Sequence, residues 1–221
     1  MTEVREQVVD RARGMRDLVR AEAAESERLR TLSTRIVDEM WASGLMSAFT
    51  PAAAGGVEPS FQEMIDTWIE MAWQDGSFGW IGIANLPSTF AAATYLPDEG
   101  FAEIFTKNEN RVTIGGQYFP NGQGAAVDGG YRLNGAWNFG SGTGHSAYIG
   151  AGFFPRAFRT CGWHFCLGRR SPSLTDGMSR GSRAPAPTIT TLPTCSCPST
   201  ELCRCSLVSL SGEIQRPAIW A

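Results

Sequence analysis

The chain has 221 residues, of which 43% are hydrophobic and 19% charged, and its formal net charge is −3. These values are ordinary for a globular protein with one large or two small domains, and no basic stripe of the kind that binds nucleic acid is visible. No apolar run approaches the roughly 20 residues that cross a bilayer, and the charged N-terminus lacks the pattern of a secretory signal. We therefore expect a cytoplasmic protein with no membrane and no nucleic-acid partner.

Five helices are predicted in the first half of the chain. Apolar residues at three- and four-residue spacing predict helices over 3–30 and 34–43. A third helix is expected after Ser60, which is a good N-cap with Glu63 three residues later. A fourth should be capped by Asp75 or Ser77 and is rich in small residues that allow close helix packing, and a fifth should begin at Pro97 and end near Phe105.

The periodicity changes from helical to extended after Asn110. Strands are predicted over 112–119 and 147–154, and Gly129-Gly130 predicts a turn before a strand that begins at Tyr131. Asn134-Gly135 is a strong hairpin signal, with Trp137–Phe139 continuing beyond it. The fold class expected is α+β, with an all-helical domain over 1–110 followed by a β domain over 111–155.

The composition changes at residue 156. Residues 1–155 hold 11 Lys and Arg against 19 Asp and Glu, whereas residues 156–221 hold 8 Arg, 3 acidic residues and all six cysteines. We expect this Arg-, Ser-, Pro- and Cys-rich tail to have little order, with 188–192 and 207–210 as its only plausible strand fragments.

Two explanations of the tail compete. The chain contains one lysine, Lys107, which suggests GC-rich codons, and such DNA read out of frame yields many Arg, Pro, Ser, Cys and Gly residues. A frameshift is the favoured interpretation. The alternative is a genuine tail in which Cys195, Cys197, Cys203 and Cys205 bind zinc, although Cys-x-Cys pairs depart from the usual ligand spacing, so no metal site is assigned.

Three segments carry a resemblance to a known family. Residues 44–56 contain Gly44-Leu45, Phe49-Thr50-Pro51 and Gly55-Gly56, and residues 71–80 read Met-Ala-Trp-Gln-Asp-Gly-Ser-Phe-Gly-Trp. The most specific segment is Gly-Gly-Tyr-Arg-Leu-Asn-Gly at 129–135, followed by Trp-Asn-Phe-Gly-Ser-Gly at 137–142. In this order they resemble the acyl-CoA dehydrogenase superfamily of flavoproteins over about residues 5–155, and the second segment looks like its flavin-dependent hydroxylase branch.

The resemblance implies a fold and a set of cofactor-binding residues. The middle domain of this family is a β barrel, incomplete here, and the family's C-terminal four-helix bundle has no counterpart in the chain. The cofactor would be a flavin, FMN or FAD, with Ser141 the candidate hydroxyl near the reactive N5 atom of the flavin. The residues that the resemblance places along the flavin are Gln117, Tyr118, Trp137, Phe139, Gly140 and Ser141.

Other residues are candidates for contact with the substrate. His145 follows the Ser-Gly turn where the hydroxylase branch often has a histidine, so Ser141 and His145 are the candidate catalytic residues. Asn85 or Ser88 lies near the position of a substrate-contacting histidine in that branch. Trp80 is a candidate for lining the substrate site. Structural roles stay open for all of them: Trp137 and Trp80 could fill a core, and Ser141 could be an ordinary turn residue.

The resemblance favours an oxygenase component that hydroxylates an aromatic or polycyclic small molecule with reduced flavin and O₂. It implies a separate flavin reductase as a partner and a homo-oligomer, often a tetramer. Two alternatives remain open, namely an acyl-CoA dehydrogenase that desaturates an acyl thioester and a truncated remnant without activity. A helical binding module would not explain the ordered set of family-like segments.

Overall fold

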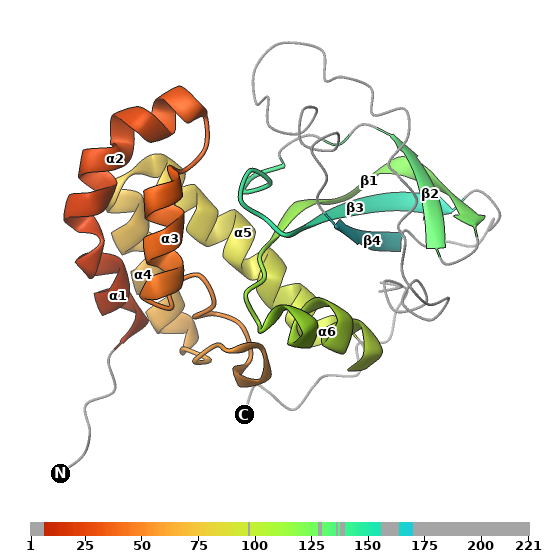
Figure 1. Ribbon diagram of the computed structural model, residues 1–221, viewed down its shortest axis with the longest axis horizontal. Coiled ribbons are helices and arrows are strands. Elements are labelled where there is room, and N and C mark those ends of the chain that lie inside the picture. The colour runs from red at the N-terminus through yellow and green to blue at the C-terminus, as the bar shows by residue number, and fades with distance from the viewer. Residues whose placement is uncertain are drawn as a thin grey trace.

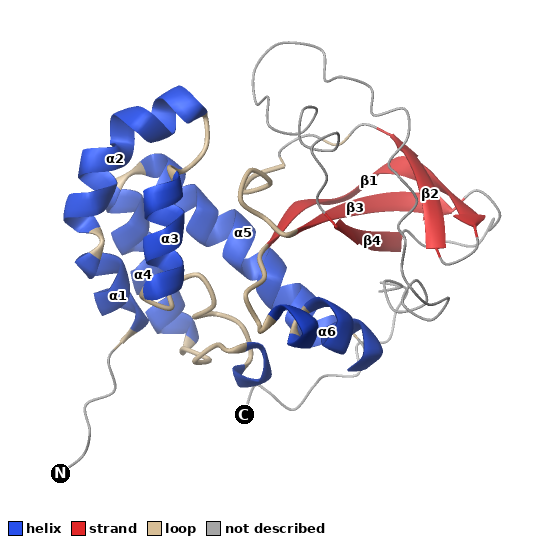
Figure 2. Cartoon of the chain, viewed as in Figure 1, coloured by secondary structure: helices blue, strands red, loops and turns tan. Residues whose placement is uncertain are grey.

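A computed structural model describes residues 7–96, 98–127, 130–135, 137, 140–155 and 164–169. Helices occupy the first part of the described chain and strands the second, and the two parts lie next to each other with helix α5 between them (Figures 1 and 2). The expected α+β order of elements is therefore confirmed.

The long helix predicted over 3–30 is divided into α1 (Val8–Gly14) and α2 (Arg16–Leu29). Met15 lies between them, and its backbone N–H bonds back to the carbonyl of Ala12. Gly14 precedes this break, and glycine is the weakest helix former after proline. The periodicity could not reveal the break because Met15 is itself a buried member of the apolar stripe.

Helices α3 (Thr34–Ala42) and α4 (Phe61–Gln74) begin where the capping signals predict. Ser60 Oγ accepts from the backbone N–H of Glu63 at 3.2 Å, which is one half of the expected capping box. The Glu63 carboxylate does not return to Ser60. It accepts instead from the backbone N–H of Val8 at 2.7 Å, so it satisfies an open donor at the start of α1 and ties α4 to the first helix.

Helix α5 (Gly76–Tyr95) is the longest helix described, and Asp75 caps it by accepting from the N–H groups of Ser77 and Phe78. A Cβ atom added at Gly79 would lie 2.4 Å from the Cα of Ala72 in α4. The small residues of α5 thus let the two helices approach closely, as the sequence predicts. The helical part closes with α6 (Asp98–Ile104), preceded by Pro97, which lies outside the described residues.

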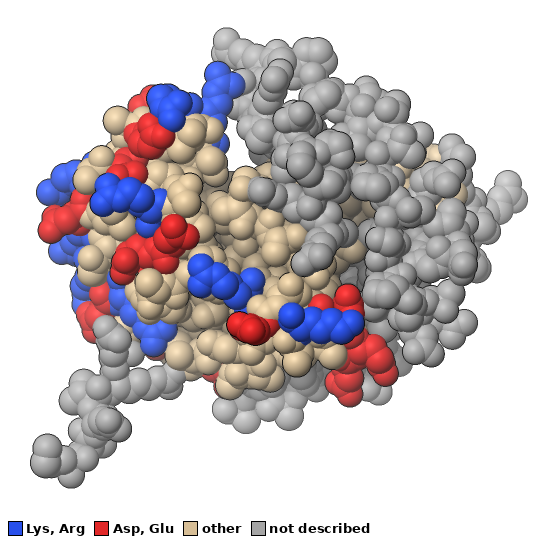
Figure 3. Space-filling view, viewed as in Figure 1, with Lys and Arg blue, Asp and Glu red and all other residues tan. Residues whose placement is uncertain are grey.

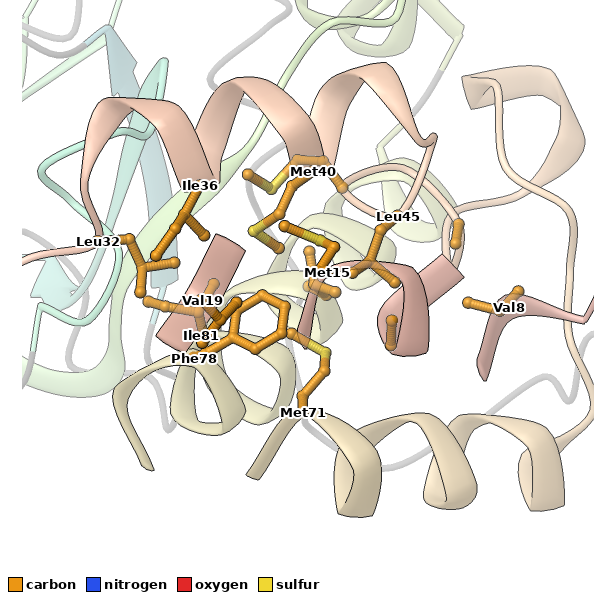
Figure 4. Close-up of a cluster of buried hydrophobic side chains, with 14 of the residues drawn as sticks. Val8, Met15, Val19, Leu32, Ile36, Met40, Leu45, Met71, Phe78 and Ile81 are labelled. Atoms are coloured by element: carbon orange, nitrogen blue, oxygen red, sulfur yellow. The ribbon is translucent and has the colours of Figure 1, made fainter. Parts of the chain in front are cut away.

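The largest buried cluster joins the first five helices and the loop after α3 (Figure 4). Phe78 and Ile81 of α5 and Met71 of α4 face Val19 of α2 across it, and Met15 lies near its centre. A second cluster packs α6 against the sheet; its members are Ala54, Ala92, Ala93, Ile104, Phe105, Val112, Ile114, Tyr148 and Leu167. Because α5 contributes to both clusters, it fixes the helices relative to the sheet.

The described strands form one sheet in the order β2-β1-β3-β4. Strand β1 (Ile114–Val127) runs antiparallel to β2 (Gly130–Gly135) and parallel to β3 (Tyr148–Pro155), and β4 (His164–Arg169) runs antiparallel to β3. The register of β1 with β3 shifts between Gln117 and Gly122. The first half of β1 lies beside α5, since Asn85 and Thr89 bond to Ile114.

Two predictions about the strands are wrong. Asn134 and Gly135 do not form a hairpin turn, because they pair with Gln123 and Gly122 inside the β1–β2 ladder. The sequence predicts strand fragments after residue 156 only at 188–192 and 207–210, but β4 lies in this part of the chain and pairs with β3 along its whole length. The predicted fragments 188–192 and 207–210 lie outside the described residues, as does Phe139.

Charges of both signs are interspersed over α1 to α3 on the face shown in Figure 3. In the part of the chain that the structure describes, none of the helices has the length and apolar character needed to span a membrane. Within those same residues, His, Cys, Asp and Glu side chains form no group that could hold a metal ion.

Candidate flavin-side loop

A Gly- and Ser-rich loop over residues 140–147 lies where α5 meets the start of β1 (Figure 1). Its backbone turns through 141–145, with the N–H of Thr143 bonded to the carbonyl of Gly140 and the N–H of His145 to that of Gly142. The loop leads into β3, whose first residues pair with β1. Three elements therefore hold it: α5 on one side and the two parallel strands on the other.

Asn85 of α5 is the main contact between the helix and this loop. Its side chain has 0% exposure. Its amide nitrogen donates to the carbonyl of Ile114 at 2.7 Å and to Ser146 Oγ at 3.2 Å, and its oxygen lies 3.3 Å from His145 Nε2. One buried amide thus joins the helix to β1 and to two residues of the loop.

The loop can approach Asn85 this closely because residue 142 is glycine. Gly142 has φ +75°, which favours glycine, and a Cβ atom there would lie 2.6 Å from Asn85 Nδ2. Gly115 on β1 has a similar role, since a Cβ there would lie 2.9 Å from the carbonyl oxygen of Ser141. A Cβ atom at either position would come too close to its neighbour, so both positions require glycine.

Ser141 is in contact with Trp80, one and a half turns before Asn85 on α5. The indole N–H of Trp80 donates to Ser141 Oγ at 2.5 Å. Trp80 is 53% exposed, so a large part of this residue is open to solvent beside the hydroxyl. The contact spans 61 positions of sequence and places a large aromatic ring and a hydroxyl together at the surface.

Further bonds join α5 to β1. Thr89 Oγ1 accepts from the backbone N–H of Ile114 at 3.0 Å and donates to the carbonyl of Asn85 at 3.1 Å. Tyr118 donates its hydroxyl to the carbonyl of Ser88 at 3.2 Å. Burial of this hydroxyl end raises the pKa of the Tyr118 phenol above its ordinary value, although the residue as a whole is 36% exposed.

The structure brings four of the predicted residues together: Trp80, Asn85, Ser141 and His145. Gly140 is buried at the base of the same loop, where its carbonyl accepts from Thr143 Oγ1 at 2.8 Å.

The remaining predicted residues lie elsewhere. Trp137 is buried, and its indole N–H donates to the carbonyl of Gly152 at 2.7 Å, so it fills the β core as its structural interpretation requires. Gln117 Oε1 accepts from Asn121 at 3.2 Å along β1, and Ser88 Oγ donates within α5 to the carbonyl of Ala84.

Sequence reasoning missed Thr89, Ser146 and the close approach of Gly142. Thr89 follows Asn85 by four residues, so both lie on one face of α5. Two neighbouring polar residues on an otherwise apolar helix are a usable signal for a buried polar contact, but their partners on β1 and the loop could not be read from the sequence.

The fold is similar to that of several solved proteins, each less than 25% identical to this chain. The HsaA monooxygenase from M. tuberculosis superposes with a TM-score of 0.65 at 23% identity over 74% of this chain and 45% of that chain. XiaF from Streptomyces sp., solved in complex with FADH2 and glycerol, gives a TM-score of 0.64 at 22% identity over 73% and 41% of the two chains.

Sequence comparison finds relatives over part of the chain. The chain is 36% identical over 146 residues to indole-3-acetate monooxygenase from Pseudomonas putida, covering 65% of this chain and 36% of that protein. It is 31% identical over 136 residues to the oxygenase component of FADH(2)-dependent resorcinol hydroxylase from Rhizobium sp., covering 61% of this chain and 32% of the relative. No family model matches the sequence. Over its matched residues the chain is similar to these two relatives, and it spans about a third of their length.

Proposed function

We propose that the chain is part of an oxygenase component of a flavin-dependent monooxygenase that hydroxylates an aromatic or polycyclic small molecule. The relatives named above support the class of reaction, since both are monooxygenases or hydroxylases of aromatic compounds by name. The acyl-CoA dehydrogenase alternative has no comparable support among them.

The contact between Trp80 and Ser141 is the observation that carries the proposal. A hydroxyl has one donor hydrogen and two acceptor lone pairs. Because the Trp80 indole N–H can only donate, it occupies an acceptor position of Ser141 Oγ. The hydroxyl hydrogen of Ser141 is therefore directed elsewhere, and it is suited to donate to an acceptor atom such as a flavin ring nitrogen.

The residues at this site fit a flavin. A flat, largely apolar ring system needs an aromatic or apolar surface together with a few hydrogen-bond donors. The exposed ring of Trp80 supplies the surface, and the Ser141 hydroxyl supplies a donor on a loop held at its base by Gly140 and Thr143. When bound, reduced flavin would supply the chemistry that activates O₂.

Within this proposal the chain's own residues bind and orient. Ser141 would hold the flavin, and Trp80 would orient the Ser141 hydroxyl and line the substrate side. The other flavin contacts that the resemblance implies stay predictions, namely Gln117, Tyr118, Trp137, Phe139 and Gly140. A substrate contact at Asn85 or Ser88 stays a prediction as well. His145 stays a candidate catalytic residue.

The proposal also covers partners and the rest of the protein. A relative described as the FADH(2)-dependent oxygenase component of a hydroxylase uses flavin that is already reduced, so a separate flavin reductase is the expected partner. We further propose that residues 111–155 are part of a middle β barrel, that a four-helix bundle follows in the complete protein, and that the complete protein is a homo-oligomer.

Titration of the purified 221-residue chain with oxidised and reduced FMN and FAD tests the proposal. We expect one flavin to bind with a shifted, structured absorbance spectrum. Ser141→Ala should weaken binding about 2- to 10-fold, the value of one hydrogen bond, whereas the matched variant Ser77→Ala at the start of α5 should bind as the parent does. If no flavin binds while circular dichroism shows a folded chain, this chain is a non-catalytic remnant and the proposal fails for it.

A further inference from the structure

The side-chain amide of Asn85 has only one possible orientation. The carbonyl oxygen of Ile114 lies 2.7 Å from one end of the amide, and a carbonyl oxygen can only accept. The NH₂ group must therefore face Ile114. Ser146 agrees with this assignment, because its hydroxyl donates to the carbonyl of Gly142 at 2.7 Å and so is free to accept from the same NH₂ group.

The orientation of Asn85 determines which nitrogen of His145 carries a proton. With the NH₂ group facing Ile114 and Ser146, the amide oxygen faces His145 Nε2 at 3.3 Å. An amide oxygen can only accept, so Nε2 must donate. In a neutral imidazole, the nitrogen that makes such a bond fixes the tautomer of the whole ring.

Hydrogen bonds also hold the backbone of His145 in place. The backbone carbonyl of His145 accepts from Thr113 Oγ1 at 3.3 Å, and its N–H is bonded to the carbonyl of Gly142. Its Nδ1 atom is buried. Backbone and side chain of His145 are thus held by Thr113 just before β1, by the loop itself and by α5.

We infer that Asn85 is a positioning residue that holds His145 as the Nε2–H tautomer and thereby fixes the loop that presents Ser141. In this arrangement Asn85 acts on the flavin side through the loop. Its importance for catalysis rests on the proposed function, whereas the tautomer follows from the geometry alone.

The test is nuclear magnetic resonance of the ¹⁵N-histidine-labelled full chain at about pH 8.5, where a histidine of ordinary pKa is neutral. The chain has only two histidines, so His164→Gln assigns the signals. We expect a proton on His145 Nε2 that exchanges slowly enough with water to be observed. A proton on Nδ1 in the parent chain would overturn the inference without any variant.

Two substitutions separate positioning from general support of the fold. Asn85→Ala removes the acceptor, so the Nε2–H signal should be lost to exchange. Asn85→Asp should retain it when the carboxyl group is protonated, because its hydroxyl can then donate to the Ile114 carbonyl while its other oxygen faces Nε2. Thr94→Ala removes a hydroxyl on the same helix that donates only to the carbonyl of Phe90 among the described contacts, and it should leave the signal unchanged. Persistence of the signal in Asn85→Ala contradicts the inference.

Flavin titration of the same variants tests the functional consequence separately. Asn85→Ala should weaken flavin binding by at least about 5-fold relative to Thr94→Ala, since about 1 kcal/mol of loop restraint is lost. If the parent chain binds no flavin but shows the Nε2–H signal, the proposed function fails while the positioning of His145 stands. If flavin binds equally to both variants, the loop does not depend on Asn85.

Discussion

At the scale of single residues, hydrogen-bond partners explain why polar side chains of α5 lie among apolar ones. Asn85, Ser88 and Thr89 interrupt an apolar helix, and each is bonded to a carbonyl or to a backbone N–H. Burial of a polar group is tolerated when it is hydrogen-bonded and is costly otherwise. The substrate contact predicted for Asn85 stays a prediction. In this conformation its amide is buried and hydrogen-bonded to other residues of the chain.

Thr89→Val tests how much one such bond stabilises the junction between helix and sheet. Valine keeps the shape but removes the oxygen that accepts from the Ile114 N–H, so a buried backbone donor loses its partner. We expect the free energy of unfolding to fall by about 1–3 kcal/mol, measured by urea denaturation.

The matched control is Thr94→Val on the same helix. Thr94 Oγ1 donates to the carbonyl of Phe90 one turn earlier, which already belongs to the helix ladder. This variant should stay within about 0.5 kcal/mol of the parent. If the two substitutions lower the free energy of unfolding equally, the bond between Thr89 and β1 does not stabilise the fold.

At the scale of elements, local signals predicted the helices better than the strands. The N-caps Ser60 and Asp75 are visible in the sequence because a cap bonds to groups within three residues of itself. The pairing of Asn134 and Gly135 with β1 is not local, and it overrides their turn preference, since the ladder gains bonds along the whole strand. Strand β4 escaped prediction for the same reason, because pairing with β3 defines it and the sequence around it lacks a period.

The pair of Arg16 and Glu70 joins α2 to α4 and gives the fold a pH dependence. The two side chains form a bidentate ion pair with both contacts at 2.7 Å, and Glu70 is largely buried. The hydrogen bond from Arg16 lowers the pKa of Glu70 below its ordinary value, with a further contribution from Gln74. A carboxyl group with a lowered pKa in the folded state stabilises the fold above its unfolded pKa of about 4.3, and this contribution is lost as the pH falls through the lower folded value.

Glu70→Gln should therefore lower the urea midpoint near neutral pH and remove part of the decline in stability below about pH 4. Unfolding curves collected from about pH 7 to 3 check both effects. Glu25→Gln is the matched control, since Glu25 pairs with Arg28 within α2 on an exposed surface and water screens that pair. A pH profile that is the same for Glu70→Gln and the parent would mean that the Arg16–Glu70 pair does not link the two helices energetically.

At the scale of the whole molecule, a family resemblance could be recognised from the sequence, but the contacts of the site could not. Short ordered motifs such as residues 129–135 carry such a resemblance because their residues are neighbours in sequence. The contacts that build the loop join residues about 60 positions apart, such as Trp80 with Ser141 and Asn85 with His145. A single sequence does not show which distant polar residues are in contact. Only the structure shows that Asn85 bonds to the loop, whereas Ser88 bonds within α5.

Large apolar side chains are exposed along α4 and α5, and we expect them to promote association. Ile69 is 62% and Ile83 48% exposed, and Phe61, Trp73 and Trp80 are exposed on the same two helices. Exposed apolar surface in water favours association. The chain spans about a third of its relatives' length, and a covering segment from the rest of such a protein would remove this exposure.

The 221-residue chain alone should therefore bind a hydrophobic dye and associate as its concentration rises. Ile69→Glu combined with Ile83→Glu should reduce both effects, because each substitution places a charge where a side chain is already exposed, with little effect on the core. Ala21→Glu combined with Ala102→Glu adds the same charge at exposed alanines of α2 and α6, and it controls for charge repulsion alone. Sedimentation velocity at increasing concentration measures the outcome. Equal suppression by both double variants would assign the effect to net charge, and a chain that stays monomeric without substitution would show that the apolar residues of α4 and α5 are no interface.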